Sequence, residues 1–209
     1  MTLSPEGTLA GNIQEIYWGE PAAAWRATYL AGDDIERSRY LDQKFCGAFP
    51  GAVLESASGE GIEDLNSNLV LRFRVKADSY AQKAGGLVLL RPRIMGWKGE
   101  LVGEEGKERK LPFVFDMTKL HTDIFEITLP DGYSAEELPT PADAAFDFGE
   151  YHSRAVIEGK LLRYTRNYSI KKLVVPAERI GDVRKFFAVV AADQRAYAVL
   201  KPPPSPASP

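Results

Sequence analysis

The side chains best suited to covalent chemistry in this chain are one thiol and two imidazoles, those of Cys46, His121 and His152. A cysteine hydrolase needs a thiolate, an imidazole that takes the thiol proton and a third group that orients the imidazole. None of the three residues stands in a local motif for such activation: Cys46 lies in FCGAFPG, and the histidines lie in TKLHTDI and EYHSRA. We therefore expect an inert buried thiol and a chain that is not an enzyme.

Other catalytic and cofactor motifs are absent from the sequence. ESASGEG has serines near glycines without the spacing of a serine-hydrolase elbow, and no phosphate-binding loop or dinucleotide fingerprint occurs. Two remote histidines make a poor zinc set, so we predict no metal and no cofactor. Calcium stays open, because GDD at 32–34 and GEGIED at 59–64 offer oxygen ligands, although helix capping and turn formation explain both segments more simply.

The stretch GKLLRYTRNYSI at 159–170 is basic and aromatic, a composition that nucleic-acid-binding surfaces also have. In a strand, alternate residues leave on opposite faces, so Arg163 and Arg166 point apart and form no single cationic platform. The net charge of −3, from 26 basic and 29 acidic residues, also provides no field that gathers phosphates. We expect no nucleic-acid partner. The face that carries Arg166 is otherwise apolar and should pack inward, so Arg166 needs a carboxylate or an aromatic ring beside it; its companions are Leu162, Tyr164, Tyr168 and Ile170.

Three tryptophans could form a sugar-stacking platform if they met on one exposed face, but tryptophans more often anchor cores or domain contacts. With three residues of the basic stretch, they complete the set of candidate ligand or docking contacts: Trp18, Trp25, Trp97, Tyr164, Arg166 and Tyr168.

The elements that must position these residues begin with a strand at 12–18 and a helix that starts near Pro21. A second short helix follows, capped by Asp33 or Asp34 and ended by Gly47 and Pro50. From there the period changes to two, most clearly in NLVLRFRVKA at 68–77. Further strands are predicted in GGLVLLRPRI, LPFVFDM and DIFEITLPDGY, with a polar loop between the first two.

The last third of the chain is predicted to be a meander, a helix and a final strand. AAFDFGEYHSRAVIEGKLLRYTRNYSI gives strand, bend, strand, tight turn and strand. Pro176 then begins a helix whose Ile180, Val183, Phe187 and Val190 share one face, and AYAVL adds the last strand. The fold class is mainly β: an antiparallel sandwich with two short N-terminal helices and one C-terminal helix packed at its margin. We expect one domain over 1–201, partly helical over 1–50, and a disordered proline-rich tail at 202–209.

Composition is that of an ordinary globular protein, with 44% hydrophobic and 26% charged residues in a chain of 209. The apolar runs are far shorter than the roughly 20 residues of a membrane-spanning helix, so no membrane span is expected. The single cysteine rules out an internal disulfide, and the N-terminus lacks the pattern of a signal peptide.

Three segments of the C-terminal half carry a resemblance to a known family. They are FEITLPDGYSAEELPTP, FDFGEYHSRAVIEGKLLRYTRNYSI and VVPAERIGDVRKFFAVVAADQRAYAVL. Their succession resembles the C-terminal β-rich domain of unknown function of bacterial multidomain transglutaminase-like proteins, in which a papain-like core precedes this region. The matching positions are Leu129-Pro130, Gly132-Tyr133, Leu138-Pro139, Arg163 and Arg166 in a hairpin, and Pro176 with Phe186 or Phe187. The front segment GTLAGNIQEIYWGEPAAAWRATY is similar to the segment on the C-terminal side of that core.

The resemblance implies a domain and not an activity. The catalytic cysteine, histidine and aspartate of the family belong to the core, so no position of this chain carries them and Cys46 is not the nucleophile. It implies a noncatalytic accessory domain that packs against and positions a transglutaminase-like domain of the parent chain, contributes contacts to a protein or peptide substrate, and works in the periplasm or outside a bacterial cell. The alternative is an independent carbohydrate- or peptide-binding β-sandwich module.

Overall fold

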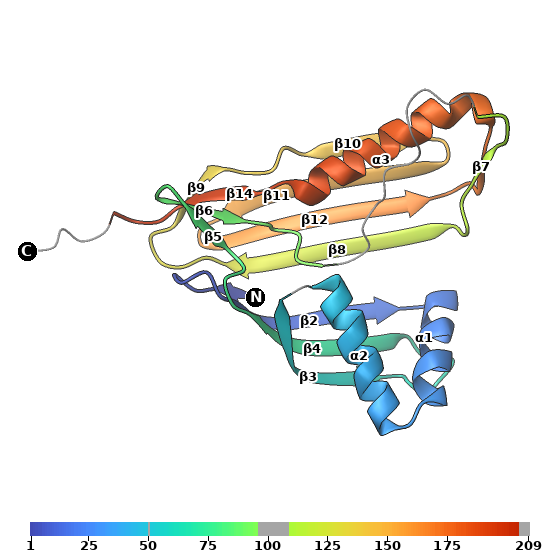
Figure 1. Ribbon diagram of the computed structural model, residues 1–209, viewed down its shortest axis with the longest axis horizontal. Coiled ribbons are helices and arrows are strands. Elements are labelled where there is room, and N and C mark those ends of the chain that lie inside the picture. Colours follow the sequence, from blue (N-terminus) through green and yellow to red (C-terminus); the bar gives the residue numbers. More distant parts are fainter. Residues whose placement is uncertain (50, 96–108, 205–209) are drawn as a thin grey trace, which may run out of the picture. The chain divides into compact units, whose positions relative to one another are not determined.

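The computed structural model describes residues 1–49, 51–95 and 109–204, with the side chains at 34, 44 and 46–48 outside the description (Figure 1). The chain divides into two compact units, Met1–Ala81 and Gln82–Pro209. The fold is mainly β, with antiparallel strand pairs, two helices near the N-terminus and one near the C-terminus. The predicted fold class is confirmed.

The first unit is a small antiparallel sheet with two helices. Its elements are β1 (Thr2–Leu3), β2 (Leu9–Tyr17), α1 (Glu20–Ala31), α2 (Asp34–Ala48), β3 (Ala52–Glu60) and β4 (Leu69–Ala77), and the strand order is β1-β2-β4-β3. The alternation predicted for β4 is confirmed, since every second residue from Leu69 to Ala77 is buried. Phe45 of α2 packs on that buried face, with its ring centre 5.8 Å from that of Phe73.

The second unit holds a larger sheet, a smaller one and a two-stranded ribbon. The larger sheet has the order β10-β11-β12-β8, formed by β8 (Lys119–Thr128), β10 (Ala142–Phe146), β11 (Gly149–Glu158) and β12 (Leu161–Ile170). The smaller has the order β5-β6-β14-β9, formed by β5 (Gln82–Ala84), β6 (Leu87–Leu90), β9 (Ser134–Glu137) and β14 (Ala198–Lys201). The ribbon pairs β7 (Phe113–Val114) with β13 (Val174–Val175).

Helix α3 (Ile180–Arg195) lies across one face of the larger sheet (Figure 1). A short 3-10 turn, Ala177–Arg179, leads into it directly after Pro176, so the proline starts the helical segment as predicted. The apolar stripe of α3 meets the inward side chains of β11 and β12, and together they form the core of this unit. The members of that core include Tyr151, Tyr168, Ile170, Val183, Phe186, Phe187 and Val190.

Most predicted elements are present, with changed bounds. LPFVFDM yields only the two residues of β7, whereas β8 begins earlier than predicted, at Lys119. The short strands β1, β5, β9 and β13 and the nine-residue β3 were not predicted. The single domain over 1–201 stays a prediction, because two compact units can belong to one domain or to two. Residues 205–209 of the proline-rich tail lie outside the described residues.

Within the described part of the chain, no helix combines the length and the apolar character needed to cross a membrane.

Candidate functional site

The pairing register of the larger sheet collects polar side chains on the face that α3 covers. Ser153, Arg166 and Asp123 are direct neighbours on β11, β12 and β8 and form one row across the sheet. Tyr151 lies in the next row on one side and Tyr164 in the next row on the other. Since side chains alternate between faces, all five residues point toward the same layer.

Arg166 is the most deeply buried charged residue of this row, at 1% exposure. Its guanidinium forms an ion pair with the carboxylate of Asp123 on the neighbouring strand. Removing one partner of a buried ion pair destabilises a protein by about 3–5 kcal/mol, because the other charge is left unpaired. The carboxylate of Asp123 is therefore what allows the guanidinium to remain in the core. Of the two kinds of partner predicted for Arg166, a carboxylate or an aromatic ring, the structure shows the carboxylate.

A second carboxylate reaches the same layer from α3. The hydroxyl groups of Tyr151 and Tyr164 both donate to Oδ2 of Asp193, the second at 2.5 Å. Asp193 is 6% exposed, and its other oxygen, Oδ1, has no hydrogen-bond partner among the described residues. We call these five residues the α3–sheet polar cluster: Asp123, Tyr151, Tyr164, Arg166 and Asp193.

The electrostatics of the cluster suit a fixed hydrogen-bond network better than a reactive centre. Burial raises the pKa of Tyr151, and the hydrogen bond to Asp193 adds to this effect; burial also raises the pKa of Tyr164, with the neighbouring Tyr151 adding to it. Both phenols therefore stay protonated and donate. Burial and the nearby guanidinium of Arg166 lower the pKa of Arg93, which brings a second cation to the cluster. Buried hydrogen bonds between a helix and a sheet favour one arrangement of the core, here that of α3 on the larger sheet.

Sequence reasoning found Arg166, Tyr164 and Tyr168 but not their partners. One signal was available: Asp193 follows Val190 by three residues, so it falls on the apolar stripe of α3, where a carboxylate needs donors. Tyr164, Tyr168 and Arg166 are buried, which confirms that they pack inward, and they present no surface to a ligand in this conformation.

The two histidines lie on opposite faces of the larger sheet. His121 sits in the inward row with Tyr168 and Tyr151, where burial and then Arg166 lower its pKa. His152 lies on the outward face and contacts Asp143, with 2.6 Å between Nδ1 and Oδ1. The side chain of Cys46 lies outside what the structure describes. Because the two imidazoles point apart, they cannot act on one substrate together.

The tryptophans differ in their surroundings. Trp25 is 5% exposed and stacks on Tyr29, with ring centres 4.5 Å apart, which is the anchoring role expected of most tryptophans. Trp18 is 58% exposed at the end of β2. Trp97 lies outside the described residues. The two tryptophans that the structure describes therefore do not share an exposed face.

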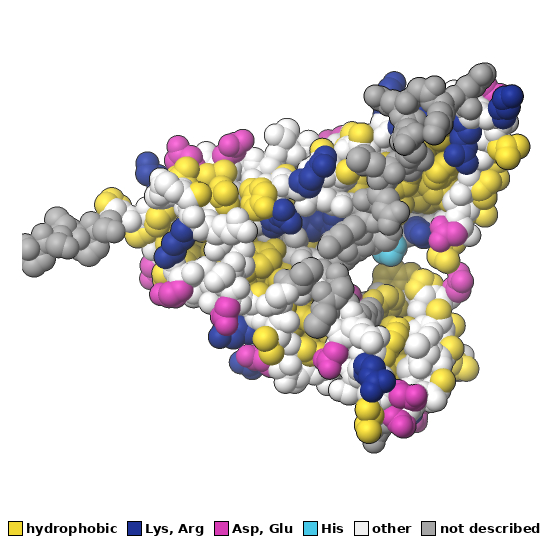
Figure 2. Space-filling model, viewed as in Figure 1, with side chains coloured by type: hydrophobic (Ala, Val, Ile, Leu, Met, Phe, Trp, Pro, Cys, Tyr) yellow, Lys and Arg dark blue, Asp and Glu magenta, His cyan; other side chains and the backbone are white. Residues whose placement is uncertain are grey.

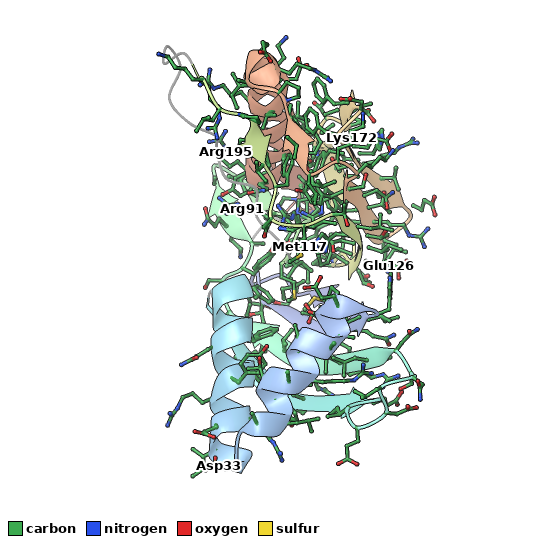
Figure 3. All side chains as sticks on the ribbon, turned by 90° about the vertical axis from the view of Figure 1, so that its right-hand side faces the viewer. Asp33, Arg91, Met117, Glu126, Lys172 and Arg195 are labelled. Carbon is green, nitrogen blue, oxygen red and sulfur yellow. The ribbon has the colours of Figure 1, made fainter. Side chains whose placement is uncertain are left out.

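The two acidic segments considered for calcium have structural roles. Asp33 caps α2 through a capping box with Glu36, at the junction of the two N-terminal helices (Figure 3). Oδ1 of Asp64 accepts the backbone N–H of Asn66 in a turn. Both predicted roles are confirmed. In the described residues, no three histidine, cysteine, aspartate or glutamate side chains are grouped closely enough to hold a metal ion.

Several exposed apolar side chains of the second unit lie on and beside its two-stranded ribbon. Val114 and Val174 are direct cross-strand partners, 63% and 55% exposed, and Leu111 and Leu173 lie on the same two segments and are also exposed. Figure 2 shows hydrophobic atoms gathered at this end of the unit, near β7. We call these four residues the β7–β13 patch. Exposed apolar clusters of this kind mark interaction surfaces more often than single exposed residues do.

Comparison with known proteins gives one match. No curated protein and no solved structure matches the chain significantly. Residues 88–200, more than half of the chain, match the model of a family described as "Domain of Unknown Function with solved-structure structure (DUF3858)". The match covers the larger sheet, α3, the polar cluster and the β7–β13 patch. The chain belongs to the DUF3858 family of domains of unknown function.

Proposed function

We propose that this chain is a noncatalytic accessory domain that packs against and positions a transglutaminase-like catalytic domain, and that the β7–β13 patch is its docking surface. The observation that carries the proposal is the exposed valine pair, Val114 and Val174, on a ribbon that is paired and held in place. Removing such side chains from water favours association by about 25 cal/mol per Å² of apolar surface.

The surroundings of the patch favour a partner with an acidic rim. Lys110 is exposed beside the patch residue Leu111, and Lys172, beside Leu173, is exposed and pairs with Asp147 at 2.8 Å. Arg109 donates from Nε to the backbone oxygen of Leu111, at 3.0 Å. An apolar centre with cations around it steers toward a surface of opposite charge and gives the contact its orientation.

The buried polar cluster supports the same proposal from inside the unit. It ties α3 to the sheet with protonated phenols and a paired guanidinium, which suits a rigid scaffold and offers no nucleophile. The resemblance to the C-terminal domain of bacterial transglutaminase-like proteins supplies the identity of the partner. We propose on the same basis that the chain works in the periplasm or outside the cell, with contacts to a protein substrate as a further part of the role.

The experiment measures binding of the full chain to the transglutaminase-like domain of the same parent protein by titration calorimetry. Replacing Val114 and Val174 by Asp puts two charges into the patch, and we expect the affinity to fall about tenfold or more. The matched control is Ile124→Asp, because Ile124 is 62% exposed on the outward face of β8 in the same unit. Equal losses in the patch variant and the control, or no binding by the unaltered chain, would contradict the proposal.

A further inference from the structure

The first unit has an unpaired sheet edge beside two hollows. β3 is the last strand of its sheet and is paired on one side only, with β4, in the described part of the chain. It is nine residues long and contains neither proline nor lysine, the residues that most often protect an edge. A bulge at Glu55 interrupts its pairing, and residues 56–60 beyond the bulge are regular.

The hollows follow β3 and the two helices. One, of about 490 Å³, is lined by residues 54–57 of β3 and by α2 from Arg37 to Asp42. The other, also about 490 Å³, is lined by the end of α1, by Arg37 and by residues 61–64. Both include Tyr29 and Arg37 in their linings, and we call the two hollows together the β3 groove.

Beyond the bulge, the side chains of β3 that face the helices are small. Ala57 and Gly59 are paired with Phe73 and Leu71, whose side chains are buried under the helices. A further hollow of about 30 Å³ lies between these small residues and the rings of Trp25 and Tyr29. A strand added to β3 would place every second side chain here, and the space takes a small apolar one.

The charges of the groove indicate which side chains a bound strand would carry on its other positions. Four carboxylates line it, those of Asp42, Glu55, Glu63 and Asp64, against the single guanidinium of Arg37. Arg37 donates from Nε to the backbone oxygen of Tyr29, at 3.0 Å, and lies over the Tyr29 ring. Glu55 is paired with Arg74, at 3.1 Å, whereas Asp42 and Glu63 form no ion pair among the described residues, so these two attract a cation.

We propose that the β3 groove binds an extended peptide segment that pairs with residues 56–60 as an added strand, with small apolar side chains toward the helices and lysine or arginine outward. Backbone hydrogen bonds to the edge supply affinity, and the alternating side chains supply specificity. This inference does not depend on the docking role, which uses a different surface in the other unit.

The test uses the full chain and a fluorescent nine-residue peptide of alternating lysine and valine, followed by fluorescence anisotropy. We expect saturable binding and at least about tenfold weaker binding of the matched glutamate–valine peptide. A lysine–valine peptide with N-methyl groups on the amides that would face β3 should not bind, whereas methylation of the other amides should be tolerated, because only one set of N–H groups pairs with a strand edge.

Two variants locate the site. Ala57→Phe fills the hollow and should abolish binding, whereas Ser58→Phe, on the other face of β3, should not. Asp42→Asn with Glu63→Gln changes only exposed carboxylates and should weaken binding about threefold or more, which keeps the test valid if Ala57→Phe fails to fold. Val174→Asp should leave peptide binding unchanged, so failure here is distinguishable from failure of the docking role.

Three results would overturn the assignment. The first is equal binding of the lysine and glutamate peptides, and the second is binding that N-methylation of neither amide set reduces. The third is a dimer of the chain, seen by sedimentation, that Ala57→Phe dissociates, because the edge would then belong to a second copy of the chain.

Discussion

Arg163 and Arg166 show how much the environment decides what an ion pair contributes. Both lie on β12 and both pair with carboxylates of β8, Glu126 and Asp123 respectively. The Arg163 side chain is 44% exposed and that of Arg166 is fully buried. Water screens the first pair, whereas the second is held where an unpaired charge is not tolerated.

We therefore expect Arg166→Met to lower the free energy of unfolding by about 3–5 kcal/mol, because Asp123 would lose its cation in a largely buried site. Arg163→Met is the matched control and should cost less than about 1 kcal/mol. Urea unfolding of the full chain, followed by circular dichroism, measures both. Adding Asp123→Leu to Arg166→Met should recover part of the loss. Similar losses for the two single variants would show that burial is not the cause.

For single residues, the sequence predicted which side chains of this strand are buried but not every residue that they contact. Strict alternation in LLRYTRNYSI was enough to place Arg166 inward and to demand a partner for it. The partner of the two tyrosines could not be predicted, because Asp193 lies on a helix 42 residues beyond Tyr151 and 29 beyond Tyr164. The way a helix lies on a sheet is set by packing in three dimensions.

At the scale of elements, burial separates the strands that were predicted from those that were not. β4, β11 and β12 bury one full face, so their sequences carry a period of two. β3 is an exposed edge of small and polar residues, ESASGE, and lacks that signal. Sequence reasoning considered this segment only for a serine-hydrolase elbow and, from Gly59 onward, for calcium, and so it missed the strand on which the peptide proposal depends.

The loop that follows β3 depends on the backbone of one glycine. Gly61 has φ +69°, and a Cβ there would lie 2.3 Å from the backbone oxygen of Asn68. Its own backbone oxygen accepts two hydrogen bonds from the buried guanidinium of Arg26, at 2.9 and 2.7 Å. The conformation of the loop is thus fixed both by the close approach of Asn68 to Gly61 and by the hydrogen bonds from Arg26.

Gly61→Ala should therefore destabilise the chain by more than about 2 kcal/mol, since steric conflict adds to the backbone strain. Gly159→Ala is the control, because Gly159 has φ +59° with open space around it and should show only the cost of the left-handed conformation, about 1–2 kcal/mol. Thermal unfolding of both variants separates the two causes. A loss at Gly61 no greater than that at Gly159 would mean that the loop moves aside easily.

At the scale of the whole molecule, the two compact units and the predicted single domain lead to different expectations for an excised second unit. The buried cluster between α3 and the larger sheet is drawn from residues between Phe115 and Val190, and the family match begins at residue 88. A segment that contains its own hydrophobic core can fold independently. We therefore expect residues 82–204 to unfold cooperatively in urea and to keep the near-ultraviolet circular dichroism of buried tyrosines. Arg166→Met in that piece should cost as much as in the full chain. An excised piece that binds a hydrophobic dye and lacks the near-ultraviolet signal would instead support one domain, because its packing would then require residues 1–81.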